Sequence, residues 1–146
     1  MAGALALVLL VGCGSATLSA RELRRRATLL CTTAVRRSNG IALPASTSGG
    51  ATFLARGITV FRPELEALRK LAPPRRLAGP YRAALAEGAQ QLDALIATDR
   101  YLGQGGDPVV AIRQLDVELG PINARDRAAW QEVGAPACSN LRIGGP

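Results

Sequence analysis

The residues of this chain best suited to chemistry are its three cysteines, because the sequence contains no histidine. A thiol can carry a lipid, pair with another thiol or bind a metal, and an odd number of thiols leaves one without a partner. Cys13 follows an apolar run near the N-terminus, whereas Cys31 and Cys138 lie 107 positions apart. The cysteines therefore divide into one N-terminal thiol and one candidate pair.

The remaining residue types give little support for a catalytic site or a metal site. Without histidine the chain lacks the usual general base near neutral pH and the commonest metal ligand, and it has no Cys-x-x-Cys motif. Acidic residues at i and i+2, such as Glu64 and Glu66, point apart on a helix. We therefore expect no enzyme, no cofactor and no metal; an enzyme would need a buried pair of carboxylates in a cleft.

The segment before Cys13 is uncharged and apolar over residues 2–12. As a helix it would span about 16 Å, roughly half of the hydrocarbon core, so its length suits a secretory signal better than a membrane span. Its last residues, Leu10-Val11-Gly12-Cys13, resemble a lipobox, the ending of bacterial lipoprotein signal peptides. This resemblance implies a signal peptide over residues 1–12, diacylglycerol on the Cys13 thiol and a lipidated tether over residues 13–18.

Two alternatives to lipidation remain open at this N-terminal segment. Ordinary secretion could cleave after Ala16 and remove Cys13, or the segment could be a buried first helix of a cytosolic protein. One feature departs from a usual signal: no lysine or arginine precedes the apolar run. Either the signal is weak at that end or the true start codon lies upstream.

Lipidation of Cys13 would leave Cys31 and Cys138 as an even pair in an oxidising exterior. We expect a disulfide between them, which would contribute up to about 4 to 5 kcal/mol by closing a loop of this length. The C-terminal tail would have to fold back over the end of the fold or along its first helix to reach Cys31. The alternative is two buried free thiols.

The positive charge is concentrated just after the tether. Of a formal net charge of +7, residues 21–37 carry +5, from six arginines and one glutamate, so the remainder carries +2. The cluster nearest to Cys13 consists of Arg21, Arg24, Arg25 and Arg26. It suits either anionic lipid headgroups or the solvated face of a helix. The local charge and few aromatic residues do not indicate nucleic-acid binding.

Apolar residues recur at three- and four-residue spacing in four segments, which predicts four amphipathic helices over residues 19–38, 51–71, 74–101 and 108–133. Ser19 and Glu22 fit a capping box at the first helix, and Asp107 fits an N-cap at the last. Pro63 either kinks its helix or begins a second segment, and Gly120-Pro121 should break or bend the last helix. An extended tail follows.

Four amphipathic helices with short joins predict an all-α, up-down four-helix bundle with Pro-kinked helices over residues 19–138, followed by a C-terminal tail over 139–146. In such a bundle the first and last helices are neighbours. Trp130 is expected to pack in the core beneath the disulfide, and Tyr81 to pack with its hydroxyl at the rim. Alternatively, Tyr81 and Trp130 line a pocket among helices two to four.

Residues 53–138 resemble a group of small uncharacterised lipoproteins from GC-rich Gram-positive bacteria of the actinobacterial type. The resemblance is carried by "LEALRKLAPPRRLAGPYRAALAEGAQQLDAL", "GGDPVVAIRQLD" and "AAWQEVGAPAC". It implies a helical fold anchored by lipid at the extracytoplasmic face of the cell membrane, and it brings no catalytic residues. We therefore expect a binding or interaction module of the cell envelope, with an envelope protein as a partner. The alternative is a secreted or anchored bundle that binds a small apolar ligand.

Overall fold

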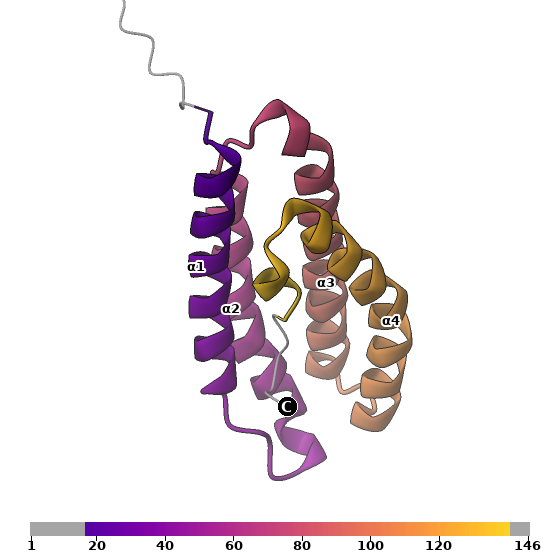
Figure 1. The fold of residues 1–146 in the computed structure, drawn as a ribbon. Helices are drawn as coiled ribbons and strands as arrows, with labels where there is room; N and C mark the ends of the chain where they lie inside the picture. The colour runs from indigo at the N-terminus through magenta and orange to yellow at the C-terminus, as the bar shows by residue number, and fades with distance from the viewer. Residues whose placement is uncertain (1–16, 141–146) are drawn as a thin grey trace, which may run out of the picture.

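A computed structural model describes residues 17–140, which form helices and no strand (Figure 1). The four α-helices are α1 (Ala20–Asn39), α2 (Gly50–Arg69), α3 (Ala78–Gly103) and α4 (Pro108–Val133). Three short 3₁₀ helices accompany them: η1 (Thr47–Gly49), η2 (Arg75–Leu77) and η3 (Pro136–Asn140). The all-helical class and the four helices are confirmed. The expected signal peptide, Cys13 and most of the tether lie outside the described residues.

The first and last α-helices begin at the residues that cap them. The Ser19 hydroxyl accepts a hydrogen bond from the Glu22 N–H at 3.1 Å. At α4, the Asp107 carboxylate accepts from the N–H groups of the second and third helical residues at 2.8 and 3.0 Å, and Pro108 takes the first helical position. The Glu22 carboxylate, which a capping box would direct back to Ser19, binds Arg25 and Arg26 instead.

The prolines within the chain do not divide its helices. α2 continues through Pro63 and α4 continues through Pro121, so the expected second segment at Pro63 and a complete break at Gly120-Pro121 do not occur. Each proline removes one backbone hydrogen bond, but it is followed by buried residues, Leu65 in α2 and Ile122 in α4, whose packing keeps the helix in place. Tertiary packing therefore outweighs the local cost of proline.

Consecutive helices pack antiparallel in the order α1, α2, α3, α4 (Figure 1). The first and last helices were expected to be neighbours; in the structure η3 contacts both α1 and α4, and α1 meets the end of α4, where Arg24 donates a hydrogen bond to Val133. The tail is therefore not extended at its start. Gly134, at φ 80°, takes the left-handed conformation that reverses the chain after α4. The chain then returns as η3 across the space between the α1–α2 pair and the α3–α4 pair.

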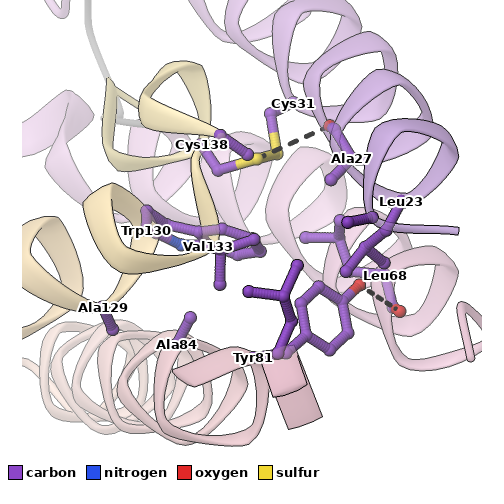
Figure 2. Packing of buried hydrophobic residues seen from close by; sticks show 13 residues of the cluster. Leu23, Ala27, Cys31, Leu68, Tyr81, Ala84, Ala129, Trp130, Val133 and Cys138 are labelled. Carbon is purple, nitrogen blue, oxygen red and sulfur yellow. Dashed lines mark hydrogen bonds between the residues drawn. A yellow bond between two sulfur atoms is a disulfide. The ribbon is translucent and has the colours of Figure 1, made fainter. Parts of the chain in front are cut away.

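The apolar core has two parts. The first joins α1, the end of α2, the start of α3, the end of α4 and η3; its members include Leu23, Ala27, Cys31, Leu68, Tyr81, Ala84, Ala129, Trp130, Val133 and Cys138 (Figure 2). The second is built from α2, α3 and α4; its buried members are Leu54, Ile58, Phe61, Leu65, Leu92, Ala94, Leu95 and Leu115. Of these two parts, α1 contributes buried residues to the first alone, and a cavity between α2, α3 and α4 adjoins the second.

Candidate functional site

A cavity of about 390 Å³ lies between α2, α3 and α4, beside the second part of the core. This volume falls within the range of small-molecule sites, about 300 to 1,000 Å³. The wall is mostly apolar and is formed by Phe53, Leu54, Gly57, Val60, Phe61, Leu95, Ile112, Leu115, Leu119 and Gly120. Four polar side chains complete it, those of Ser38, Gln91, Asp116 and Asn123. The site therefore combines an apolar wall with a few polar groups, as ligand pockets do.

An open groove of about 680 Å³ adjoins the cavity and shares Phe53, Ile112 and Asp116 with it. It runs between the segment that precedes α2 and the first turns of α4. Its apolar residues are exposed: Leu43 by 70% and Val109 by 54%. The cavity therefore communicates with solvent along a largely apolar surface.

Two of the polar groups in the cavity wall are almost fully buried. Ser38, at the end of α1, is 2% exposed, and Gln91, on α3, is 8% exposed. Asp116, on α4, is exposed and is the one charged residue among those that line the cavity in the described part of the chain. The interior of the cavity therefore offers hydrogen-bonding groups but no cation.

Gln91 also serves a second buried group, the carboxyl of Asp126 on α4, which is 6% exposed. Burial raises the pKa of Asp126 to about 6, hydrogen bonds from Gln91 and Trp130 lower it, and the negative charge of Glu87 raises it. At neutral pH the carboxyl is therefore mostly ionised and can only accept hydrogen bonds. Gln91 and Asp126 both border the same small void in the core, so the polar part of the cavity wall lies close to this buried carboxyl.

A second buried carboxyl, Glu64 on α2, is 9% exposed, and its Oε1 has no hydrogen-bond partner. Burial raises its pKa and the charge of Arg37 lowers it. Neither Glu64 nor Asp126 lines the 390 Å³ cavity. Asp126 borders a void of about 20 Å³, which is too small for a substrate. The two buried carboxyls are thus placed in the packed core.

Tyr81 and Trp130 lie in the first part of the core and not in the cavity wall. Their rings meet edge to face, with centroids 5.7 Å apart and an interplanar angle of 85°. Trp130 packs close to the disulfide (Figure 2). The Tyr81 hydroxyl donates to the Leu68 carbonyl oxygen at 2.7 Å, and the side chain is 1% exposed. Its hydroxyl is therefore inside the fold, where burial raises its pKa, and not at the rim.

The predicted disulfide between Cys31 and Cys138 is present and joins α1 to η3, with the two Cα atoms 4.9 Å apart. Cys31 is 1% exposed and Cys138 is 5% exposed. The tail reaches Cys31 because Gly134 turns it back across α1. The bond therefore fixes the returning tail to the first helix.

The four arginines nearest to the expected anchor have different surroundings. The Arg24 Nε donates to the Val133 carbonyl oxygen at 2.8 Å and so satisfies a carbonyl at the end of α4. Arg25 and Arg26 are exposed and pair with Glu22. Arg21 is exposed as well. All four arginines are thus exposed on α1, and one of them, Arg24, also ties this helix to the end of α4.

Gln91 and Asp126 were not among the candidate residues expected from the sequence, although the position of each in its helix is informative. Gln91 falls in the apolar stripe of α3, three residues after Gly88 and four before Leu95. Asp126 falls in the stripe of α4, four residues after Ile122 and four before Trp130. A polar residue within an apolar stripe predicts a buried polar group, which usually has a partner.

No family model, curated protein or solved structure matches this chain. Among residues 17–140, no helix is long and apolar enough to cross a membrane. In the same part of the chain, no cluster of three or more cysteine or acidic side chains is placed to hold a metal ion. The geometry of the cavity is therefore the principal guide to what the molecule binds.

Proposed function

We propose that this protein is a binding module that holds a small, largely apolar ligand in the cavity between α2, α3 and α4. The observation that carries the proposal is the 390 Å³ volume of this cavity together with its ten apolar and four polar lining residues. Covering apolar wall surface contributes roughly 25 cal/mol per Å² to binding before ordering costs. Binding, and not catalysis, is the function that such a wall favours, and the proposal includes no metal or cofactor.

The adjoining groove supports this proposal because it supplies a route of entry. A ligand would first meet exposed apolar residues of the groove, such as Leu43 and Val109. It would then pass Phe53 and Ile112, which line both the groove and the cavity. An apolar path of this kind holds the ligand loosely before the deeper cavity encloses it.

Gly120 provides a sharp test of the cavity. It lines the wall, and a Cβ at this position would meet no atom within 4 Å. The Cβ of Gly120→Leu therefore meets no clash; we expect its longer side chain to take up part of the cavity, and the loss of a helical glycine should raise helix stability by about 1 kcal/mol. Gly79→Leu is the matched control, because Gly79 is also helical with open space around it but does not line the cavity.

The measurement is a fluorescence titration with Nile red, a neutral apolar dye, followed by competition with unlabelled apolar compounds. We expect saturable binding to the original protein and to Gly79→Leu, and at least about tenfold weaker binding to Gly120→Leu. Equal dye binding by all three proteins, or no saturable binding by any, would refute the cavity as the site.

A second proposal concerns where this module acts. We infer that the chain is exported and held at the extracytoplasmic face of the cell membrane by lipid on Cys13, as a lipoprotein of the cell envelope. The Cys31–Cys138 disulfide supports export, because such bonds persist in oxidising compartments and are rare in the cytosol. The exposed side chains of Arg21, Arg25 and Arg26 support contact with anionic headgroups.

Lipid anchorage is tested in cells that express the full chain. Globomycin, which blocks removal of lipoprotein signals, should cause an uncleaved precursor to accumulate, and Cys13→Ala should move the protein out of the membrane fraction. Cys13→Ala leaves the disulfide pair untouched, so the purified variant should fold and bind Nile red as before. An unchanged membrane fraction after Cys13→Ala would overturn the anchor without affecting the cavity.

A further inference from the structure

Positive charge gathers at the end of the molecule where α1 begins. The backbone N–H of Leu18, just before α1, donates a hydrogen bond to the Ala72 carbonyl oxygen at 2.9 Å. This bond holds the start of α1 beside the connection between α2 and α3 (Figure 1). We call residues 17–26 and 66–77 together the basic end of the molecule. The segment before α2 and the turn between α3 and α4 lie at the opposite end.

The cations of the basic end outnumber its carboxylates. All eight cations are exposed: Arg21, Arg24, Arg25, Arg26, Arg69, Lys70, Arg75 and Arg76. Its two carboxylates, Glu22 and Glu66, already pair with arginines of the same helix, and Glu132 in the last turn of α4 adds one more nearby.

Four of these cations have no acidic partner. Within residues 17–140, no ion pair includes the side chain of Arg21, Lys70, Arg75 or Arg76. They come from two segments that are distant in the chain and that the fold brings to one end. Repulsion among like charges is unfavourable in the free molecule, and an anionic surface would relieve it.

The proposed lipid anchor would bring this same end to a membrane. Five residues along the chain lead from Cys13 to Leu18, and they span at most about 17 Å. This reach is about two screening lengths at physiological salt. Each cation near an anionic surface strengthens binding about fivefold. Salt weakens such contacts, so they orient a protein that lipid holds and do not replace the lipid.

We propose that the basic end docks on anionic phospholipid headgroups and stands the helices on the membrane, with the apolar groove facing away from it. α2 begins at the groove with Gly50 and ends in the basic end with Arg69, and its 20 residues span about 30 Å. A ligand therefore enters the groove from the aqueous side. The inference rests on the proposed lipid anchor and extends it by naming the docking surface and the orientation.

Lys70 makes the orientation measurable, because it is the only lysine in the chain. An amine-reactive acetylating reagent therefore reports on the basic end at one side chain. Arg100→Lys adds a reference amine at an exposed position in the last turn of α3, at the opposite end. The full chain is purified as Cys13→Ala/Arg100→Lys, so that no lipid assists binding.

Acetylation of the two lysines is measured by mass spectrometry with and without vesicles. Vesicles of equal parts phosphatidylglycerol and phosphatidylcholine should slow acetylation of Lys70 at least about fivefold relative to the reference lysine. Vesicles of phosphatidylcholine alone should not, and high salt should abolish the protection. Equal protection of both lysines, protection of neither, or protection that survives high salt would overturn the proposal.

A pair of charge variants separates local from overall attraction. Arg75→Gln/Arg76→Gln removes two cations from the basic end, and Arg56→Gln/Arg100→Gln removes two exposed cations nearer the opposite end. Both variants lower the net charge from +7 to +5. In the Cys13→Ala background, the first pair should weaken co-sedimentation with the anionic vesicles at least about tenfold, and the second by less than about threefold. Equal losses would show that net charge alone drives binding and would refute the docking surface.

The outcomes distinguish this inference from the anchor on which it rests. If Cys13→Ala leaves the membrane fraction in cells but anionic vesicles do not protect Lys70, the anchor stands and the docking surface fails. If lipid on Cys13 is disproved but the vesicles still protect Lys70, the anchor fails and the basic end remains a lipid-binding surface. Duplex DNA that binds more tightly than the vesicles, and loses affinity with Arg75→Gln/Arg76→Gln, would overturn the membrane as the partner.

Discussion

Asp126 is the residue whose environment departs most from what its type prefers. A carboxyl that is 6% exposed loses most of its hydration, and hydrogen bonds from Gln91 and Trp130 replace only part of it. The burial of the charged form therefore costs stability. The same group thus links the packing around Trp130 to the polar part of the cavity.

This burial makes stability depend on pH. The pKa of Asp126 rises from 3.8 to about 6 on folding, so between these values the folded chain binds more protons than the unfolded chain. The free energy of unfolding therefore falls as pH rises through about 6. We expect the protein to be about 1 kcal/mol more stable at about pH 5 than at about pH 8, as measured by urea unfolding.

Asp126→Asn isolates this contribution, because it removes the charge and keeps the shape. We expect the variant to be more stable than the original protein at about pH 8, with a smaller gain on acidification. Burial also raises the pKa of Glu64, so part of the pH dependence should remain in the variant. Asp93→Asn, at an exposed position on α3, is the control and should behave like the original protein. Identical pH profiles for Asp126→Asn and the original protein would contradict the prediction.

At the scale of elements, η3 packs against both α1 and α4, where an up-down bundle would bring these two helices into contact. Cys138 of η3 and Ala135 just before it are buried in the same cluster as the small residues Ala27 and Cys31 of α1. Two attachments hold η3 in place: the disulfide to α1 and the reversal at Gly134. A segment after the last helix is therefore a part of the core.

The disulfide should contribute a large share of the stability of this fold. The double variant Cys31→Ser/Cys138→Ser removes a cross-link over 107 residues, which corresponds to about 4 to 5 kcal/mol in the chain-entropy model. We expect a fall of this order in the free energy of unfolding, measured with urea. A reducing agent should destabilise the original protein to a similar extent and leave the double variant unchanged. Destabilisation below about 1 kcal/mol would contradict this estimate.

At the scale of the whole molecule, the cavity is a space beside the second part of the core that the side chains do not fill. A ligand that binds the folded chain alone stabilises it by mass action, by about 2.7 kcal/mol at a concentration one hundred times the dissociation constant. We expect decanol, a small and largely apolar test ligand, to raise the thermal midpoint of the original protein and of Gly79→Leu. Gly120→Leu, whose cavity is partly filled, should start from a higher midpoint and respond less. An equal shift in all three proteins would indicate binding elsewhere.

Much of the helical structure could be predicted from the sequence because its causes are local. Asp107 with Pro108, and Gly134 after Val133, mark the two ends of α4 within one or two residues. The start of α3 was less well predicted: the helix was expected from residue 74, but η2 comes first and α3 begins at Ala78. For each proline the sequence left two outcomes open, an interruption or a kink of one helix, and the structure shows that both helices continue through the proline.

The sequence by itself therefore predicted the helices and the packing of Trp130 in the core, and it favoured a disulfide between Cys31 and Cys138, which the structure contains. Only the tertiary structure decided that η3 packs against both α1 and α4, that Gln91 meets Asp126, and that a cavity opens between α2, α3 and α4. The physical reason is distance along the chain. Caps and apolar stripes act over three or four residues, whereas a cavity is the space left where three helices meet and depends on the packing of all of them.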